Sequence, residues 1–210
     1  ALASDEVALS QHPEWWLRTL QAAWPNDWPS IIAAGNGPPP MALRVNQRRS
    51  TLDEYQQRLS LEGIAATPVG KYGLMLEKPV PVERLPGFAA GLVSVQDPGA
   101  QMAAALLNPA PNSRVLDACA APGGKTAHLL ERARLDMLAL DLKPARCRRV
   151  EANLTRLGLG AAIKAGDCAK LDTWWDGEPF DAVLADVPCT ASGVVRRNPD
   201  SKWLRRETDI

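Results

Sequence analysis

Leu116-Asp-Ala-Cys-Ala-Ala-Pro-Gly-Gly-Lys-Thr126 follows an apolar run and precedes Ala127-His-Leu-Leu130. This order predicts a β-strand, a tight glycine loop and the first turn of a helix. Gly123 and Gly124 carry no side chain where the backbone must turn sharply or approach a ligand, and a helix N-terminus offers unpaired N–H groups to an anion. We therefore expect a ligand-binding loop here, with Asp117 adding a negative charge at the end of the strand.

Three kinds of ligand could bind at such a loop. A phosphate loop requires Gly-x-x-x-x-Gly-Lys-Ser/Thr, but Cys119 stands where its first glycine would be. The dinucleotide fingerprint Gly-x-Gly-x-x-Gly is missing as well. S-adenosylmethionine fits better, because its carboxylate suits the loop amides while its ammonium, sulfonium and ribose hydroxyls suit carboxylates. A glycine-rich turn that binds no ligand is the alternative interpretation.

The chain around the loop alternates between predicted strands and predicted helices. Strands are expected over 114–117, 137–141, 162–166 and 182–186, and helices over 126–133 and 144–157. This alternation is typical of an α/β fold whose parallel sheet has helical crossovers. We place a domain boundary near residue 90, so that residues 91–210 form the α/β domain.

Four aspartates stand where predicted strands end, namely Asp117, Asp141, Asp167 and Asp186. In open α/β sheets, ligands bind at the carboxyl ends of the strands, near the point where the strand order reverses. Asp141 lies 24 positions after Asp117, close to the offset of about 20 residues at which an acidic residue reaches a ribose. We therefore expect Asp141 to accept ribose hydroxyls and Asp167 to lie beside the adenine. Taken singly, each aspartate could instead cap a helix or shape a turn.

Residues 1–90 are predicted to form a helical segment followed by a small α+β unit. Residues 1–34 carry an apolar stripe at helical spacing, and Trp24-Pro25 and Trp28-Pro29 are expected to break the helix. The tryptophans could stack on nucleobases, although packing is the commoner role of such a stripe. In the α+β unit, a capping box of Thr51 and Glu54 begins a helix. Strands are expected over 41–46, 64–69 and 73–76.

The composition excludes several classes of protein. Lys and Arg together number 24, as do Asp and Glu, so any polyanion site must be a local patch. No apolar run of membrane-spanning length and no signal pattern is present, and we expect a cytoplasmic protein without a membrane partner. The four cysteines lack CxxC spacing, which argues against zinc and against a disulfide framework. Cys147 falls on an apolar helix face and is expected to pack, whereas Cys189 is expected on a loop facing the ligand.

Several motifs together resemble the RNA cytosine-5 methyltransferases, and within them the bacterial 16S ribosomal RNA methyltransferase B type. The motifs are Asp117 to Thr126, Asp186-Val-Pro-Cys189, Leu43-Arg-Val-Asn46, Val95-Gln-Asp-Pro-Gly-Ala-Gln101, and Ser192-Gly-Val-Val-Arg-Arg-Asn-Pro-Asp200 with Lys202-Trp203. The resemblance implies a Rossmann-like domain, C-terminally incomplete, that uses S-adenosylmethionine and follows a small RNA-binding domain. The implied cofactor contacts are Cys119, Ala120, Ala121, Pro122, Gly123, Gly124, Lys125, Asp141, Asp167 and Asp186.

The resemblance also assigns roles to cysteines. A thiolate that adds to C6 of cytosine makes C5 nucleophilic enough to accept a methyl group. In the family, the nucleophile stands in a Thr-Cys motif, and the Pro-Cys cysteine, matched here by Cys189, assists product release. Since the sequence contains no Thr-Cys pair, we expect the nucleophile beyond residue 210 and a further helical RNA-binding domain before residue 1. The alternative function is a cofactor-binding or RNA-binding fragment without turnover.

The expected substrate is 16S ribosomal RNA, bound by a monomer without a metal. Arg44, Arg196, Arg197 and Lys202 are the predicted RNA contacts, and Arg48, Arg49, Arg205 and Arg206 lie near them in the sequence. A solvated charged surface is the alternative for these residues. Methylation of an exocyclic nitrogen is disfavoured, because Asp186-Val-Pro-Cys189 has a thiol where such enzymes place an aromatic residue.

Overall fold

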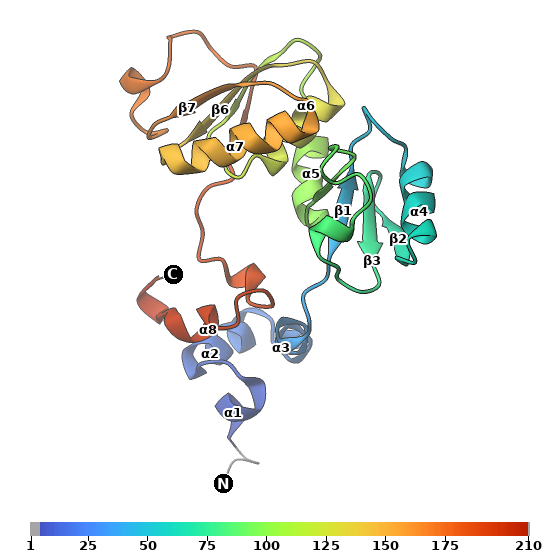
Figure 1. Ribbon diagram of the computed structural model, residues 1–210. Coiled ribbons are helices and arrows are strands. Elements are labelled where there is room, and N and C mark those ends of the chain that lie inside the picture. The colour runs from blue at the N-terminus through green and yellow to red at the C-terminus, as the bar shows by residue number, and fades with distance from the viewer. Residues whose placement is uncertain (1–4, 210) are drawn as a thin grey trace. The chain divides into compact units, whose positions relative to one another are not determined.

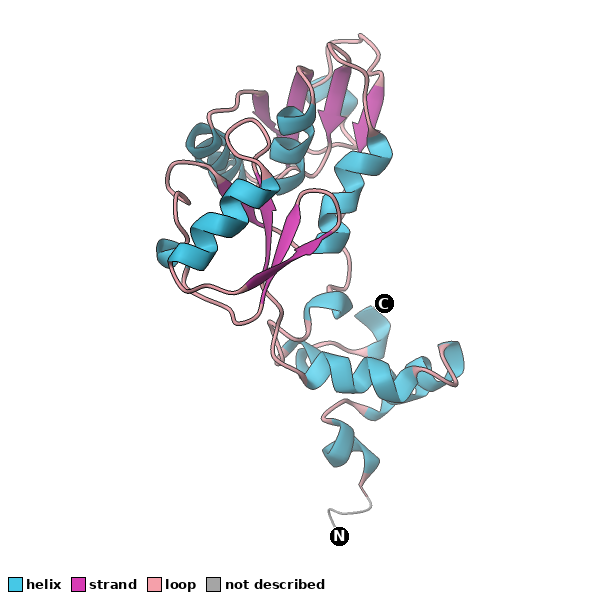
Figure 2. Ribbon diagram, turned by 90° about the vertical axis from the view of Figure 1, so that its right-hand side faces the viewer, coloured by secondary structure: helices cyan, strands magenta, loops and turns pink. Residues whose placement is uncertain are grey.

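The computed structural model describes residues 5–209, which form two compact units (Figure 1). One unit spans Pro40–Val187. The other combines the described residues up to Pro39 with those from Pro188 onward. The unit that spans Pro40–Val187 contains two separate sheets, visible as two groups of strands in Figure 2.

The first sheet is antiparallel, with the strand order β2-β3-β1-β4. Its strands are β1 (Ala42–Val45), β2 (Ala66–Val69), β3 (Gly73–Leu76) and β4 (Val93–Val95). The helix α4 (Leu52–Leu61) packs against β2 and β3. It begins with the predicted capping box, since the Thr51 hydroxyl accepts from the Glu54 N–H and the Glu54 carboxylate accepts from the Thr51 N–H. Leu43, Val45 and side chains of α4 form the core of this layer.

The second sheet is parallel, with the strand order β7-β6-β5-β8. It consists of β5 (Arg114–Asp117), β6 (Asp136–Asp141), β7 (Ala162–Ala165) and β8 (Ala182–Leu184). The helices α5 (Pro98–Leu107), α6 (Gly124–Arg132) and α7 (Pro144–Leu157) precede or connect its first strands. The predicted α/β fold with a preceding small α+β unit is thus confirmed. Because the chain leaves β5 toward β6 and later returns to its other side as β8, the strand order reverses at β5.

The apolar helix face that the sequence predicted around Cys147 belongs to α7 and lies in the core of the second sheet. The side chains of Val150, Leu154 and Leu157 on α7 are buried there together with Leu129 and Leu130 of α6. Cys147 lies on the same face of α7 and is also buried, which confirms its predicted packing role.

The second compact unit is helical. It contains α1 (Glu6–Ser10), α2 (Glu14–Ala23), α3 (Trp28–Asn36) and α8 (Ser201–Leu204). Trp24-Pro25 separates α2 from α3 as predicted, but the expected break at Trp28-Pro29 is wrong. Pro29 instead lies in the first turn of α3, where a missing N–H leaves no hydrogen bond unmade. The first four residues of the predicted helical segment lie outside the described residues.

The strand β4 follows residue 90 and joins the first sheet through β1, with Leu43 opposite Val95. The predicted division of the chain at residue 90 stays a prediction. None of the described helices combines the length and the apolar composition that a membrane crossing requires.

Candidate functional site

The predicted glycine loop connects β5 to α6 at the point where the strand order reverses. Gly123 caps α6 with φ of 94°, in the left-handed region that favours glycine. A Cβ at this position would lie 3.2 Å from the Cα atom of Val150 on α7. The loop therefore packs closely on α7, and its backbone is fixed by both its conformation and its neighbours.

A cavity of about 180 Å³ lies against this loop. It brings together most of the predicted cofactor residues with Asp117, and its lining residues include Cys119, Ala120, Ala121, Pro122, Gly124, Lys125 and Asp186. Gly123, Asp141 and Asp167 are not among its lining residues. Two larger cavities, of about 590 and 730 Å³, lie elsewhere in the same unit, but the strand-end carboxylates Asp117 and Asp186 meet at the smaller one.

Asp117 is the most buried carboxylate of this cavity, with 1% of its surface exposed. Its Oδ2 accepts a hydrogen bond of 2.6 Å from the Thr126 hydroxyl, while its Oδ1 has no partner among residues 5–209. Burial raises the pKa of this carboxyl above its ordinary value, against the opposing effects of the Thr126 hydroxyl and the nearby Cys119 N–H. A cationic group placed beside Oδ1 would supply the missing partner.

Asp141 ends β6 and holds the loop from the side. Its carboxylate is 2% exposed and accepts hydrogen bonds from the Ala121 N–H, at 3.1 Å, and from the Lys143 N–H, at 3.3 Å. The Arg146 guanidinium lies 3.4 Å from the carboxylate and donates to the Ala121 carbonyl. Asp141 therefore fixes the loop in this structure, and its contact with a ribose stays a prediction.

The two remaining strand-end aspartates have different surroundings. Asp186 lies beyond the end of β8, which is two residues shorter at this end than predicted, and its carboxylate forms an ion pair with Lys125. Asp167 shapes a turn, because its Oδ1 accepts from the Ala169 N–H at 3.0 Å. The contact of Asp167 with adenine stays a prediction.

Cys189 belongs to the helical unit that contains residues from Pro188 onward. Its thiol is exposed, and the Sγ atom accepts a hydrogen bond from the Ala191 N–H at 3.4 Å. The role of Cys189 in product release stays a prediction. Within residues 5–209, His, Cys, Asp and Glu side chains form no group of three that could hold a metal ion.

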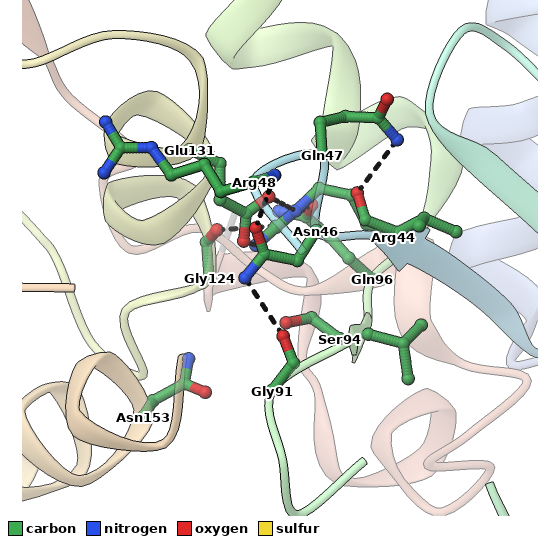
Figure 3. A network of polar contacts seen from close by, with 12 residues as sticks. Arg44, Asn46, Gln47, Arg48, Gly91, Ser94, Gln96, Gly124, Glu131 and Asn153 are labelled. Carbon is green, nitrogen blue, oxygen red and sulfur yellow. Dashed lines mark hydrogen bonds and ion pairs between the residues drawn. The ribbon is translucent and has the colours of Figure 1, made fainter. Parts of the chain in front are cut away.

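The structure contradicts the predicted RNA contact of Arg44. This side chain is fully buried, and its Nε and one terminal nitrogen donate to the two carboxylate oxygens of Glu131 at 2.9 and 2.8 Å. The other terminal nitrogen donates to the Gln96 side-chain oxygen and, at 2.8 Å, to the Gly124 carbonyl (Figure 3). An RNA phosphate cannot reach a guanidinium that is fully buried and whose three nitrogens all donate to groups of the protein.

Lys202 is likewise unsuited to its predicted phosphate contact. It is 3% exposed, and its ammonium donates to the Asn36 side-chain oxygen at 2.7 Å. Burial lowers its pKa. Arg196 is half-buried and donates to the Pro38 carbonyl at 2.6 Å, whereas Arg197 is exposed. The RNA contacts of Arg196 and Arg197 stay predictions.

The sequence did not indicate Gln96 or Arg146 as site residues, and it placed the charge of Asp117 at the ligand loop without naming it as a cofactor contact. Gln96 lines the cavity from the segment between β4 and α5. The available signal was its place in Val95-Gln-Asp-Pro-Gly-Ala-Gln101, which contributed to the resemblance without a role for its first glutamine. For Arg146, five residues after Asp141, no pattern in the sequence pointed to the loop.

Comparison with known proteins identifies the family of the chain. Residues 104–210 match the family described as 16S rRNA methyltransferase RsmB/F, and residues 12–83 match the ferredoxin-like domain of RsmF/B-like methyltransferases. The ribosomal RNA small subunit methyltransferase B of Pseudomonas syringae pv. tomato is 49% identical over 213 residues, covering 100% of this chain and 48% of the relative. The protein of the same name from Vibrio cholerae is 48% identical and covers 99% and 48%.

The chain thus spans about half the length of the curated relatives it matches. Among solved structures, a methyltransferase homolog protein from Pyrococcus horikoshii is 27% identical with a TM-score of 0.80, covering 97% of this chain and 65% of that one. This likeness confirms the Rossmann-like fold that the resemblance implied. Since one family covers half of the chain and its companion domain covers most of the residues before it, this chain belongs to the 16S rRNA methyltransferase RsmB/F family.

Proposed function

We propose that this chain binds S-adenosylmethionine and serves the methylation of C5 of a cytosine in 16S ribosomal RNA. The observation that carries the proposal is the buried Asp117 carboxylate, whose Oδ1 lacks a partner among the described residues beside the glycine loop. Two of the curated relatives carry the name ribosomal RNA small subunit methyltransferase B, which supports ribosomal RNA methylation as the class of reaction.

The residues at the cavity fit the cofactor by their chemistry. Asp117 offers a buried acceptor to the ammonium group of its amino-acid end, and the N-terminus of α6 offers N–H groups to the carboxylate. We assign the ribose to Asp141 and the adenine to the neighbourhood of Asp167, with Cys119 to Lys125 and Asp186 around the remainder. When bound, the cofactor supplies an electrophilic methyl group on a sulfonium.

Thiol chemistry completes the proposed reaction. C5 of cytosine is a weak nucleophile, so a cysteine thiolate adds to C6, and the electron pair that reaches C5 takes the methyl group. A base then takes the proton from C5, and the electrons of that C–H bond restore the C5–C6 double bond as the C6–S bond breaks and the thiolate is released. We assign Cys189 to this release step, with its exposed thiol free to approach the product.

A second candidate function is binding without turnover. None of the four cysteines, at positions 119, 147, 168 and 189, follows a threonine. For residues 1–210 by themselves we therefore expect cofactor binding and no methyl transfer. We assign Arg197, whose side chain is exposed, to RNA phosphates, whereas the buried Arg44 and Lys202 have other roles.

Two measurements test the proposal. Calorimetric titration of the purified protein with S-adenosylmethionine tests cofactor binding, and absence of saturable binding would reject the proposal outright. Incubation of the complete protein, and separately of residues 1–210, with labelled cofactor and unmodified 16S RNA tests turnover. Nucleoside analysis should find 5-methylcytidine with the complete protein only. A methyl group on an exocyclic nitrogen would contradict the assignment to C5.

A further inference from the structure

Gln96 presents an amide to the cavity beside the glycine loop. It lies between β4 and α5, is 9% exposed and is one of the residues that line the cavity. Its Oε1 accepts a hydrogen bond from Arg44 (Figure 3). An arginine side chain has only donors, so the amide oxygen must face Arg44 and the amino group must face away from it. A Cβ built on Gly124 would lie 3.6 Å from Gln96 Nε2, which places the amino group beside the loop.

The Arg44 guanidinium is held so firmly that it fixes the orientation of this amide. Its two bonds to Glu131 form a bidentate pair, in which the exposed fractions of the two side chains are 0% and 2%. It also donates to the Gly124 carbonyl at 2.8 Å. One buried cation therefore ties β1, the start of α6 and the side chain of Gln96 together, and the Gln96 amide cannot turn over without breaking a bond to a charged donor.

The cavity has few side-chain donors for the negative end of a ligand. Among its lining residues in the described part of the chain, Gln96 and Lys125 carry the side-chain N–H groups, and Lys125 is paired with Asp186. Asp117 lines the same cavity with an oxygen that has no partner among residues 5–209. A neutral donor and an unpartnered carboxylate within one small cavity suit a ligand group that carries both a carboxylate and an ammonium.

We propose that the Gln96 amino group binds the carboxylate at the amino-acid end of the cofactor and that Arg44 is its positioning residue. The inference rests on the proposed function and extends it to two residues of the first sheet and its connection to α5. The loop amides at the start of α6 share the same carboxylate, and Asp117 takes the ammonium. Arg44 touches no ligand and acts by orienting the Gln96 amide.

Two ligands that differ at the amino-acid end test the contact. S-adenosylhomocysteine has the carboxylate and the ammonium, and 5′-methylthioadenosine lacks both. In Gln96→Glu the side-chain shape and the oxygen toward Arg44 are kept, but the donor is replaced by a negative oxygen. Calorimetry of the purified protein should show an affinity loss on the order of 10-fold to 100-fold for S-adenosylhomocysteine, the range for a hydrogen bond to a charged group. The affinity for 5′-methylthioadenosine should stay unchanged. Gln96→Met, which is neutral, should show the same selectivity with a smaller loss.

A matched pair of arginine variants tests the positioning role. Arg156 on α7 donates to the Phe88 and Val93 carbonyls at 2.7 and 3.0 Å. Like Arg44, it therefore links a helix of the second sheet to a strand of the first sheet, but it has no contact with Gln96 or the loop. Arg44→Lys should weaken S-adenosylhomocysteine selectively, whereas Arg156→Lys should lower the melting temperature without that selectivity. Equal losses for both ligands, or none, in the Gln96 variants would overturn the inference while leaving the proposed function intact. A wild-type protein that binds neither ligand would overturn both.

Discussion

Arg44→Met should strongly destabilise the unit that contains both sheets. The substitution removes a cation that makes two hydrogen bonds to the Glu131 carboxylate, one to Gln96 and one to the Gly124 carbonyl. Because Glu131 is only 2% exposed in its side chain, its charge is left in the interior without a partner. Breaking a buried pair in this way costs about 3 to 5 kcal/mol. For a chain of this length we expect a fall in melting temperature of roughly 2 to 4 °C per kcal/mol.

The double variant Arg44→Met/Glu131→Leu separates the ion pair from simple packing. Replacing both charges by apolar side chains of similar volume removes the stranded carboxylate, and such replacements are often neutral or stabilising. We therefore expect the double variant to be more stable than Arg44→Met alone, although Gln96 and Gly124 still lose their donor. Urea unfolding followed by tryptophan fluorescence measures both, and an unchanged slope with urea keeps the comparison valid.

Arg18→Met is the matched control for this experiment. Arg18 lies 3.7 Å from Glu207, and their side chains are 63% and 65% exposed, so the loss should stay below about 1 kcal/mol. If Arg44→Met costs no more than this control, or if the double variant is less stable than the single one, the pair does not hold the unit together as argued.

Four further outcomes are expected. Asp117→Asn should abolish cofactor binding but stabilise the ligand-free protein at neutral pH. Burial raises the pKa of Asp117 in the folded state, so this carboxyl destabilises the folded protein at pH values above the ordinary aspartate pKa of about 4. The stability gained by Asp117→Asn should therefore vanish as the pH falls toward that value, as melting curves across pH will show. Asp141→Ala should weaken S-adenosylmethionine binding by roughly 1.5 to 3 kcal/mol in calorimetry; unchanged affinity would leave Asp141 as a loop anchor alone. Arg197→Ala should weaken RNA binding and reduce the slope of log K against log salt by about 0.7 to 0.9, whereas an unaltered slope would make Arg197 an ordinary surface residue. Cys189→Ser in the complete protein should let an SDS-resistant RNA adduct accumulate on denaturing gels; no adduct and no methylation would make Cys189 the nucleophile.

The elements around the glycine loop could be predicted because their signals are local. The strand end at Asp117, the turn at Gly123 and the apolar face of α7 each follow from residues within one or two turns of one another. The same holds for the capping box of α4. Asp186 was predicted to end a strand, but β8 ends at Leu184 and the aspartate follows it on a loop.

The role of Arg44 could not be predicted, because its partners are remote in the sequence. Alternation in β1 places Arg44 on the opposite face from Leu43 and Val45, and on an open sheet that face would be solvated. Here Arg44 is buried and bonded to residues of α6, and the carboxylate that makes the burial tolerable belongs to Glu131, 87 residues away. Lys202 shows the same limit, since its partner Asn36 is 166 residues away. Spacing within a segment reports which face a side chain takes, but not what covers that face.

The contacts of Arg44 give the first sheet a role at the glycine loop. The sheet was expected to serve RNA, yet through Arg44 it contacts the carbonyl of Gly124 in the predicted cofactor loop. The residues matched as the methyltransferase family begin at position 104 and thus contain Glu131 but neither Arg44 nor Gln96. A buried Glu131 carboxylate without Arg44 would be costly. The helix α6, which carries Glu131, therefore depends on β1 for the cation that pairs with this carboxylate. The first sheet is therefore part of what holds the glycine loop, whatever it contributes to RNA binding.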